Sequence, residues 1–234
     1  MKKVLIIIIV SIVIFIAAGY GLLILSNSRD FQFYGGLVTK ADTDEKVVAL
    51  TFDDGPTKNT DQILKILKDA DVKATFFLTG REIKENFGEA EKIVLAGHEL
   101  GNHSYSHKRM ILKTPTFIKN EIETTDALIK KTGYKGPIEF RPPYGKKLVG
   151  LPRYLDKQNR KTILWNIEPD SYPEIASDSQ KIVEHVNKNI EPGSIILLHV
   201  MYGSRTESIE AVKDIVDSLK AKGYKFKKVS EMVE

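Results

Sequence analysis

From Val47 onward, short apolar runs alternate with longer stretches in which apolar residues recur at helical spacing. This alternation constrains the fold of the chain more than any other feature, because it is typical of parallel strands joined by helical crossovers. We therefore expect an α/β fold with a parallel sheet, open or closed into a barrel. The expected strands are Val47–Phe52, Thr75–Leu78, Glu99–Gly101, Ile138–Arg141, Thr162–Asn166, Ser194–His199 and Lys225–Val229.

Helix-start signals and amphipathic stretches lie between these runs. The segment Asp61–Lys68 presents a broad apolar face, and Thr114 followed by Pro115 is typical of an N-cap with proline at the first helical position. Ser177 and Gln180 have the spacing of a capping box, which predicts that Ser177 caps the next helix. A further stripe of helical period is made by Ile209, Val212, Val216 and Leu219.

The N-terminus carries an apolar run from Val4 to Leu25, preceded by Lys2 and Lys3. As a helix, these residues would span roughly 33 Å, enough for a ~30 Å hydrocarbon core. A cleavable signal peptide is the alternative, but its apolar region normally ends after ~7–15 residues. We expect residues 1–25 to be a single-pass membrane anchor that leaves the rest of the chain on the extracytoplasmic side; secretion after signal cleavage is the alternative.

Composition places the remainder among globular proteins. The formal charge of +4 includes the two N-terminal lysines, so the exported part carries +2 (4 − 2). The sequence contains no basic run with interleaved aromatic residues, which is the pattern that would predict nucleic-acid binding. The chain has no cysteine, which excludes disulfides. We expect residues 26–45 to form a linker and residues 46–234 to form one domain, a monomer that binds no nucleic acid.

Ionisable side chains stand where the expected strands end. They are Asp53, Asp54, His103, His107, Arg141 and His199. In parallel α/β architectures, functional sites gather at the carboxyl ends of the strands, so these scattered residues are expected to converge. Two histidines and one carboxylate are a common ligand set for a divalent metal with open positions, and the other carboxylate is then free to act as a base. The same residues have alternative interpretations without a catalytic role. An Asp-Asp-Gly sequence is typical of a surface turn, and His199 would fit a buried position in the core.

Four motifs in one order give these residues a family context. They are TFDDGP (51–56), GHELGNHSYSH (97–107), RPPYG (141–145) and ILLH (196–199). In them the chain resembles the polysaccharide deacetylases of carbohydrate esterase family 4, which share the NodB homology domain, over about Lys46 to Val229. The resemblance implies a distorted (β/α) barrel with about seven parallel strands, and hydrolysis of N-acetyl groups on amino sugars.

Carried over by position, the resemblance implies a metal site and a catalytic base. Asp54, His103 and His107 would hold a divalent metal, zinc first and cobalt as an alternative. Asp53 would take a proton from water and Arg141 would pair with it.

The resemblance also implies the acid half of the reaction. The backbone N–H of Tyr144 would bind the oxyanion, and His199 would protonate the departing amine. Pro143, Trp165 and Leu197 are expected beside the substrate.

The chain departs from the family pattern after Trp165. The family commonly has Asp-x-x-Asp-Trp there, and its second acid tunes the catalytic histidine. Here Glu168 takes the place of the first acid, while Ser171 and Tyr172 replace the Asp-Trp pair. Asp170 is one position out of register, so its contact with His199 is an open expectation.

The expected function is removal of N-acetyl groups from N-acetylglucosamine of a cell-wall glycan, with peptidoglycan the first candidate because the chain is exported. Three alternatives stay open: a chitooligosaccharide deacetylase, an O-acetyl polysaccharide deacetylase, and a catalytically weak glycan-binding relative. The expected partners are the glycan and, through the N-terminal helix, the membrane.

Overall fold

The structure is a computed structural model that describes residues 2–233. Its strands are β1 (Leu37–Val38), β2 (Val47–Asp53), β3 (Thr75–Leu78), β4 (Glu99–Asn102), β5 (Thr162–Ile163), β6 (Ile195–Leu198) and β7 (Lys225–Phe226). Its α-helices are α1 (Lys2–Asn27), α2 (Thr60–Asp69), α3 (Gly80–Glu85), α4 (Phe87–Leu95), α5 (Pro115–Lys131), α6 (Gly150–Asp156), α7 (Pro173–Ala176), α8 (Ser179–Asn189) and α9 (Thr206–Ala221). Short 3₁₀ turns lie at Pro143–Gly145, Pro169–Ser171 and Val229–Glu231.

The strands form a distorted barrel. The central sheet has the order β4-β3-β2-β6, with β7 also paired to β2, and all of these ladders are parallel. Single parallel bridges continue the ring, since Phe140 pairs with both Asn102 and Thr162 and Ile167 pairs with Ile196 beside β6. The expected α/β fold with a distorted parallel barrel is therefore confirmed.

Three expected strands are shorter than predicted. The strand expected at Lys225–Val229 ends at Phe226, and Val229 begins a 3₁₀ turn. At Ile138–Arg141 only Phe140 forms a bridge, because prolines on both sides (Pro137 and Pro142) offer no N–H for a ladder. The ladder expected over Thr162–Asn166 ends at Ile163, where the chain leaves β1 and crosses toward β6.

The helix-start predictions had mixed outcomes. Thr114 caps α5 as expected, with its hydroxyl accepting the Phe117 N–H at 3.2 Å. The prediction that Ser177 caps α8 is wrong, because Ser177 ends the short helix α7. The cap is Asp178, whose carboxylate accepts the N–H of Gln180 at 2.8 Å and suits the positive end of the helix dipole.

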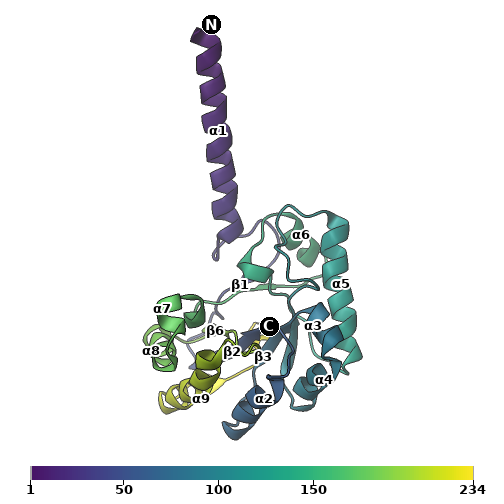
Figure 1. Cartoon of the computed structure of the whole chain (residues 1–234), viewed down its shortest axis with the longest axis vertical. Coiled ribbons are helices and arrows are strands. Elements are labelled where there is room, and N and C mark those ends of the chain that lie inside the picture. The colour runs from purple at the N-terminus through teal and green to yellow at the C-terminus, as the bar shows by residue number, and fades with distance from the viewer. Residues whose placement is uncertain (1, 234) are drawn as a thin grey trace.

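The core lies between the strands and the surrounding helices, as Figure 1 shows. Every residue of β2, β3 and β6 is buried, which explains why these strands are continuous apolar runs instead of alternating ones. Helices α2, α4, α8 and α9 supply the apolar faces that cover them. The carboxyl ends of the strands are thereby held rigidly, and they carry the polar residues.

The N-terminal helix α1 stands away from the rest of the molecule in Figure 1. It is long and apolar enough to cross a membrane, a criterion that a signal sequence meets as well. Residues that follow it enter the barrel: β1 pairs with β5, and the Ala41 N–H donates to the Gly193 carbonyl at 2.9 Å. The boundaries at residues 25 and 45 stay predictions.

Candidate active site

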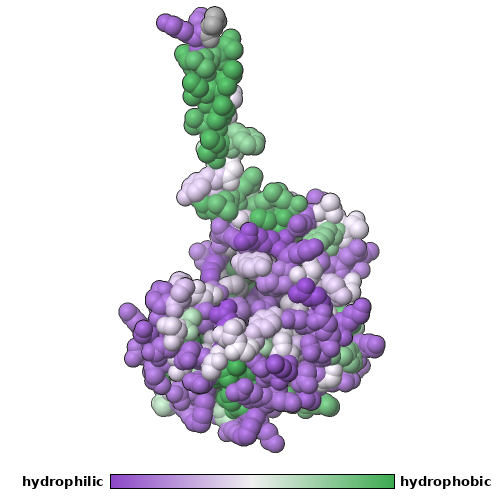
Figure 2. All heavy atoms as spheres, in the orientation of Figure 1, coloured by the Kyte–Doolittle hydropathy of each residue, from purple (hydrophilic) through white to green (hydrophobic). Residues whose placement is uncertain are grey.

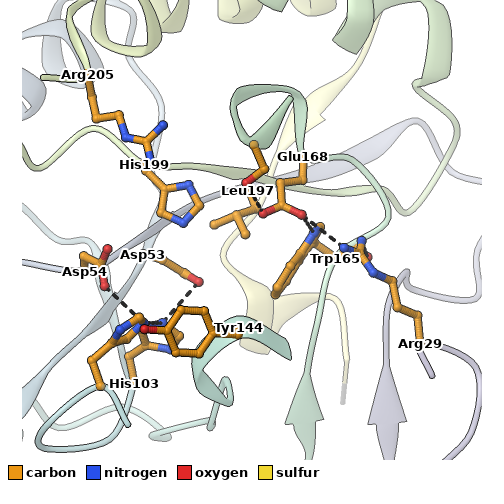
Figure 3. Close-up of a pocket in the computed structure, with 12 residues that line it drawn as sticks. Arg29, Asp53, Asp54, His103, Tyr144, Trp165, Glu168, Leu197, His199 and Arg205 are labelled. Atoms are coloured by element: carbon orange, nitrogen blue, oxygen red, sulfur yellow. Dashed lines mark hydrogen bonds and ion pairs between the residues drawn. The ribbon is translucent and has the colours of Figure 1, made fainter. Parts of the chain in front are cut away.

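The carboxyl ends of the strands open into a cavity of about 410 Å³, shown in Figure 3. The residues predicted from separate motifs come together here, as expected for a parallel barrel. The cavity is lined by Arg29, Asp53, Asp54, His103, His107, Tyr144, Trp165, Glu168, Ser171, Leu197, His199 and Arg205.

Asp54, His103 and His107 present a cluster of possible metal ligands. One ligand atom from each lies within 4.8 Å of the other two. The Nε2 atoms of the two histidines are 3.2 Å apart, and an Asp54 oxygen lies 3.5 Å from His107 Nε2. Two nitrogens bound to one tetrahedral ion at about 2.0–2.1 Å would stand about 3.4 Å apart, so the spacing fits such an ion.

The protonation of the two histidines suits metal binding as well. Burial lowers the pKa of His103 and that of His107, although neighbouring carboxylates oppose the shift, so both rings are neutral near pH 7. His103 Nδ1 lies 2.7 Å from the Arg141 carbonyl oxygen. A neutral ring that donates from Nδ1 leaves the Nε2 lone pair for a metal, and carbonyl acceptors commonly fix histidine ligands in this way. The donor set therefore fits a divalent ion.

The loop that carries His103 and His107 is shaped by residues of its own motif and by Glu121, which no motif indicated. Ser104 and His107 both have left-handed backbone angles (φ 65° and 55°). Glu121 of α5 accepts the N–H groups of Tyr105 and Ser106 at 3.0 and 2.8 Å, and the Ser106 hydroxyl as well. Asn102 accepts the Ser104 N–H at 2.8 Å. These bonds fold the His-x-x-x-His sequence so that the two rings meet without a helix.

Asp53 ends β2 as a buried ion pair with Arg141. Its Oδ1 accepts from Arg141 Nη1 at 2.6 Å, and its Oδ2 lies 3.5 Å from His103 Nε2. Burial raises the pKa of Asp53, but the Arg141 charge and hydrogen bond, together with the nearby histidines, outweigh it, so the pKa lies below its ordinary value. Asp53 is therefore a carboxylate at neutral pH.

Arg141 has no freedom to leave this position. It is fully buried, donates to Thr51 Oγ1 at 2.8 Å and to the Leu164 carbonyl at 3.1 Å, and stacks over the Phe77 ring at 4.0 Å. A planar guanidinium held on several sides fixes the orientation of the Asp53 carboxylate.

Asp54 adopts a left-handed backbone conformation (φ 70°), which points its side chain away from that of Asp53. Glu82 of α3 holds the turn, since its Oε2 accepts the Gly55 N–H and the Thr79 hydroxyl, each at 2.8 Å. Tyr202 donates to the other Glu82 oxygen. Burial, with the charges of Asp53 and Glu82, raises the pKa of Asp54, an environment that favours a cation beside it.

His199 follows β6 and is held by Asp170. Its Nδ1 lies 3.1 Å from Asp170 Oδ1, and its backbone N–H donates to Oδ2 at 2.6 Å. Asp170 is buried and also accepts from the Ser208 hydroxyl at 2.9 Å. Burial alone would lower the pKa of His199, but the bond and charge of Asp170, with Asp53 and Asp54, raise it to about 9. Asp170, which is one position out of register with the family pattern, is therefore the acid that contacts His199.

Glu168, which holds the family's acid position by register, turns away from His199. It accepts from Trp165 Nε1 at 2.7 Å, Ser171 Oγ at 2.6 Å and Arg29 Nη2 at 3.0 Å. The Arg29 guanidinium also stacks over the Trp165 ring at 4.6 Å (Figure 3). Arg29 comes from the segment expected to be a linker, and no sequence signal marks it as a site residue.

The remaining predicted site residues are distributed as follows. Tyr144 has a left-handed backbone (φ 60°) and a half-exposed ring 4.7 Å from that of His107. Trp165 and Leu197 line the cavity but are almost fully buried, so each offers it little surface. Pro143 is buried and is not among the lining residues.

Comparisons with known proteins agree with this geometry. The sequence model of the polysaccharide deacetylase family matches residues 40–163. A peptidoglycan-N-acetylglucosamine deacetylase of Bacillus cereus is 32% identical over 206 residues, which cover 88% of this chain and 96% of the relative.

Solved structures extend the likeness to three dimensions. The Bc1960 peptidoglycan N-acetylglucosamine deacetylase, crystallised with a hydroxamate-type benzamide, superimposes with a TM-score of 0.79 at 31% identity, covering 83% of this chain and 91% of that one. BA3943 of Bacillus anthracis, described as a CE4 family pseudoenzyme, gives a TM-score of 0.76 at 30% identity, covering 84% and 68%.

Proposed function

This chain belongs to the polysaccharide deacetylase family, and from that membership and its site we propose that it hydrolyses N-acetyl groups on N-acetylglucosamine residues of a cell-wall glycan, with peptidoglycan the first candidate. The observation that carries the proposal is the arrangement around the cavity. A possible metal site lies beside an ionised Asp53, and a protonated His199 lines the same cavity.

In the proposed mechanism, Asp54, His103 and His107 hold a divalent ion, zinc first and cobalt as an alternative. When bound, such an ion polarises the acetyl carbonyl and makes water more acidic. Asp53, oriented by Arg141, takes one proton from the attacking water as its oxygen bonds to the carbonyl carbon. The Tyr144 backbone N–H donates to the developing oxyanion.

His199 completes the reaction by donating a proton to the amide nitrogen as the C–N bond breaks, which yields acetate and a free amine. Its Nδ1 faces Asp170, so the other ring nitrogen is the donor toward the cavity. A pKa of about 9 keeps His199 protonated at neutral pH, while Asp53 stays ionised. The two groups thus start in opposite protonation states, as a base and an acid must.

The proposal includes a location and partners. We place α1 in the membrane as an uncleaved anchor, with the barrel on the extracytoplasmic side as a monomer and the glycan as its substrate. Zinc or cobalt is the expected ion. The glycan-binding alternative was motivated by the altered residues after Trp165, and the Asp170–His199 contact weakens that motive.

The test is acetate release by the full chain in detergent, after saturation with zinc, from peptidoglycan, chitooligosaccharides and an O-acetylated xylan. The metal content of the same preparation is measured. We expect one ion per chain, release from the N-acetylated glycans, and loss of release in His103→Ala and Asp53→Asn. The Asp53→Asn protein should still bind the ion, because Asp53 is not a ligand. A wild-type chain that carries one ion and releases no acetate would contradict the proposal.

A further inference from the structure

More than half of the large apolar side chains that are exposed outside α1 come from segments near the end of that helix. Among residues 2–233, nine large apolar side chains outside α1 are more than a third exposed, and Leu95 at the end of α4 is one of them. Tyr144, which lines the catalytic cavity, is another. Five of the nine lie next to the end of α1 and are here called the helix-foot surface: Phe31, Phe33, Tyr34, Leu112 and Val149.

The aromatic part of the helix-foot surface follows directly on the apolar helix. Phe31 lies four residues after Asn27, the last residue of α1. The rings of Phe31 and Phe33 pack edge to face with centroids 5.1 Å apart, and each side chain remains 46% exposed. Figure 2 shows hydrophobic atoms continuing from α1 onto the adjoining part of the domain.

The aliphatic part comes from two other segments brought to the same place. The Lys147 N–H donates to the carbonyl of Ser26 in the last turn of α1 at 3.1 Å, and the Lys147 ammonium contacts the Ser28 carbonyl. Val149 lies two residues further on and shares a mainly apolar cavity of about 250 Å³ with Leu112, which is 85% exposed. Residues 108–113 around Leu112 carry three basic side chains and no acidic one.

We propose that the helix-foot surface lies on the membrane that α1 enters, among the headgroups of anionic lipids. The inference rests on the proposed function in one respect, that α1 stays uncleaved. Aromatic side chains at the end of a membrane helix prefer the water–lipid interface, and basic residues beside an exposed leucine complement anionic headgroups. The contact continues the surface that α1 would bury in lipid, and it removes the helix-foot surface from water.

The catalytic cavity then lies near the membrane. Arg29 lines the cavity, and only Ser28 separates it from Asn27, the last residue of α1. Its Cα therefore lies at most about 7 Å from the Cα that ends the helix. The substrate class is glycan that adjoins the bilayer, either nascent strands or the innermost wall, instead of glycan in the outer wall.

The test uses the natural lack of cysteine in the chain. Phe33→Cys and Leu112→Cys variants of the full chain are each labelled with an environment-sensitive fluorophore and placed, one copy per disc, in lipid nanodiscs of phosphatidylglycerol and phosphatidylethanolamine. Leu95→Cys is the matched control, because Leu95 is as exposed as Leu112 but lies at the end of α4, where no described contact joins it to α1. Acetate release is measured on every preparation.

We expect blue-shifted emission at positions 33 and 112, several-fold weaker quenching by aqueous iodide than at position 95, and quenching by lipids spin-labelled near the headgroup. Labels at 33 and 112 that iodide quenches as strongly as the label at 95 would overturn the proposal, even with normal acetate release. Shielding that arises only when several copies share a disc would overturn it in favour of contacts between copies. Shielded labels without acetate release would support the membrane contact and count against the proposed function alone.

Discussion

Asp170→Asn should move the alkaline limb of the pH profile of acetate release toward neutrality. The Asp170 carboxylate contacts both the ring and the backbone N–H of His199, and it is the main group that raises the pKa of His199 to about 9. Without this charge, burial pulls the pKa back toward or below its ordinary value of 6.5.

The size of the effect follows from the protonated fraction of His199. A group with a pKa of about 9 is roughly 97% protonated at pH 7.5, whereas one at about 6.5 is only about 10% protonated. Loss of the acid form alone should lower kcat at pH 7.5 by about tenfold, and the alkaline limb should move by about 2.5 pH units. Loss of the bond that orients the ring adds to this reduction.

The assay is kcat for acetate release between pH 6 and 10, with saturating metal and a soluble N-acetylglucosamine oligomer. Glu168→Gln is the matched control, because Glu168 occupies the family's acid position but bonds to Trp165 and Arg29 instead of His199. Its alkaline limb should stay in place. An unmoved limb in Asp170→Asn, or an equal movement in Glu168→Gln, would refute the assignment of Asp170 as the group that tunes His199.

Three further predictions follow from the same contacts. Between pH 6.5 and 9, His199 of the folded protein holds a proton that the unfolded chain releases, so the free energy of unfolding of the metal-free protein should fall by up to about 3 kcal/mol over this range. Denaturant titrations at several pH values measure this fall, and a free energy that does not change with pH would contradict the prediction. Arg141→Met leaves Asp53 buried without its partner, so urea unfolding should show a loss of about 3–5 kcal/mol, and a loss below 1 kcal/mol would count against the pairing. Arg29→Ala should raise KM for glycan oligomers and leave kcat nearly unchanged in steady-state assays, because Arg29 lines the cavity away from the reacting groups. A fall of kcat as large as the fall of kcat/KM would mean that Arg29 acts on the reacting groups.

The sequence predicted the barrel and the convergence of the site, because both depend on local patterns. Buried strands appear as apolar runs, and polar residues at their carboxyl ends meet at one rim whatever the connecting loops do. Asp53, His103 and His199 lie in one cavity for this reason.

The supporting residues could not be predicted in this way, because they act across long separations. The bond between Arg29 and Glu168 joins positions 139 residues apart, from a segment without apolar periodicity. Glu82 and Glu121 resemble ordinary surface acids of helices, yet both are nearly buried and hold the loops of the possible metal ligands. The contact of Asp170 with His199 depends on the 3₁₀ turn at Pro169–Ser171, which sequence register does not reveal.

The segment that joins α1 to the barrel, residues 28–36, is short and is held at several points. It contacts Lys147 at Ser28, reaches Glu168 through Arg29, and enters the ring of strands at Leu37. With α1 uncleaved in the membrane, as proposed, a domain tied this closely keeps its orientation to the bilayer as the anchor diffuses. The encounter between enzyme and glycan then becomes a search in two dimensions, governed by lateral diffusion and by the time for which a strand stays near the membrane. The extent of deacetylation would accordingly record the age of a strand at its encounter with the enzyme, not its final depth in the wall.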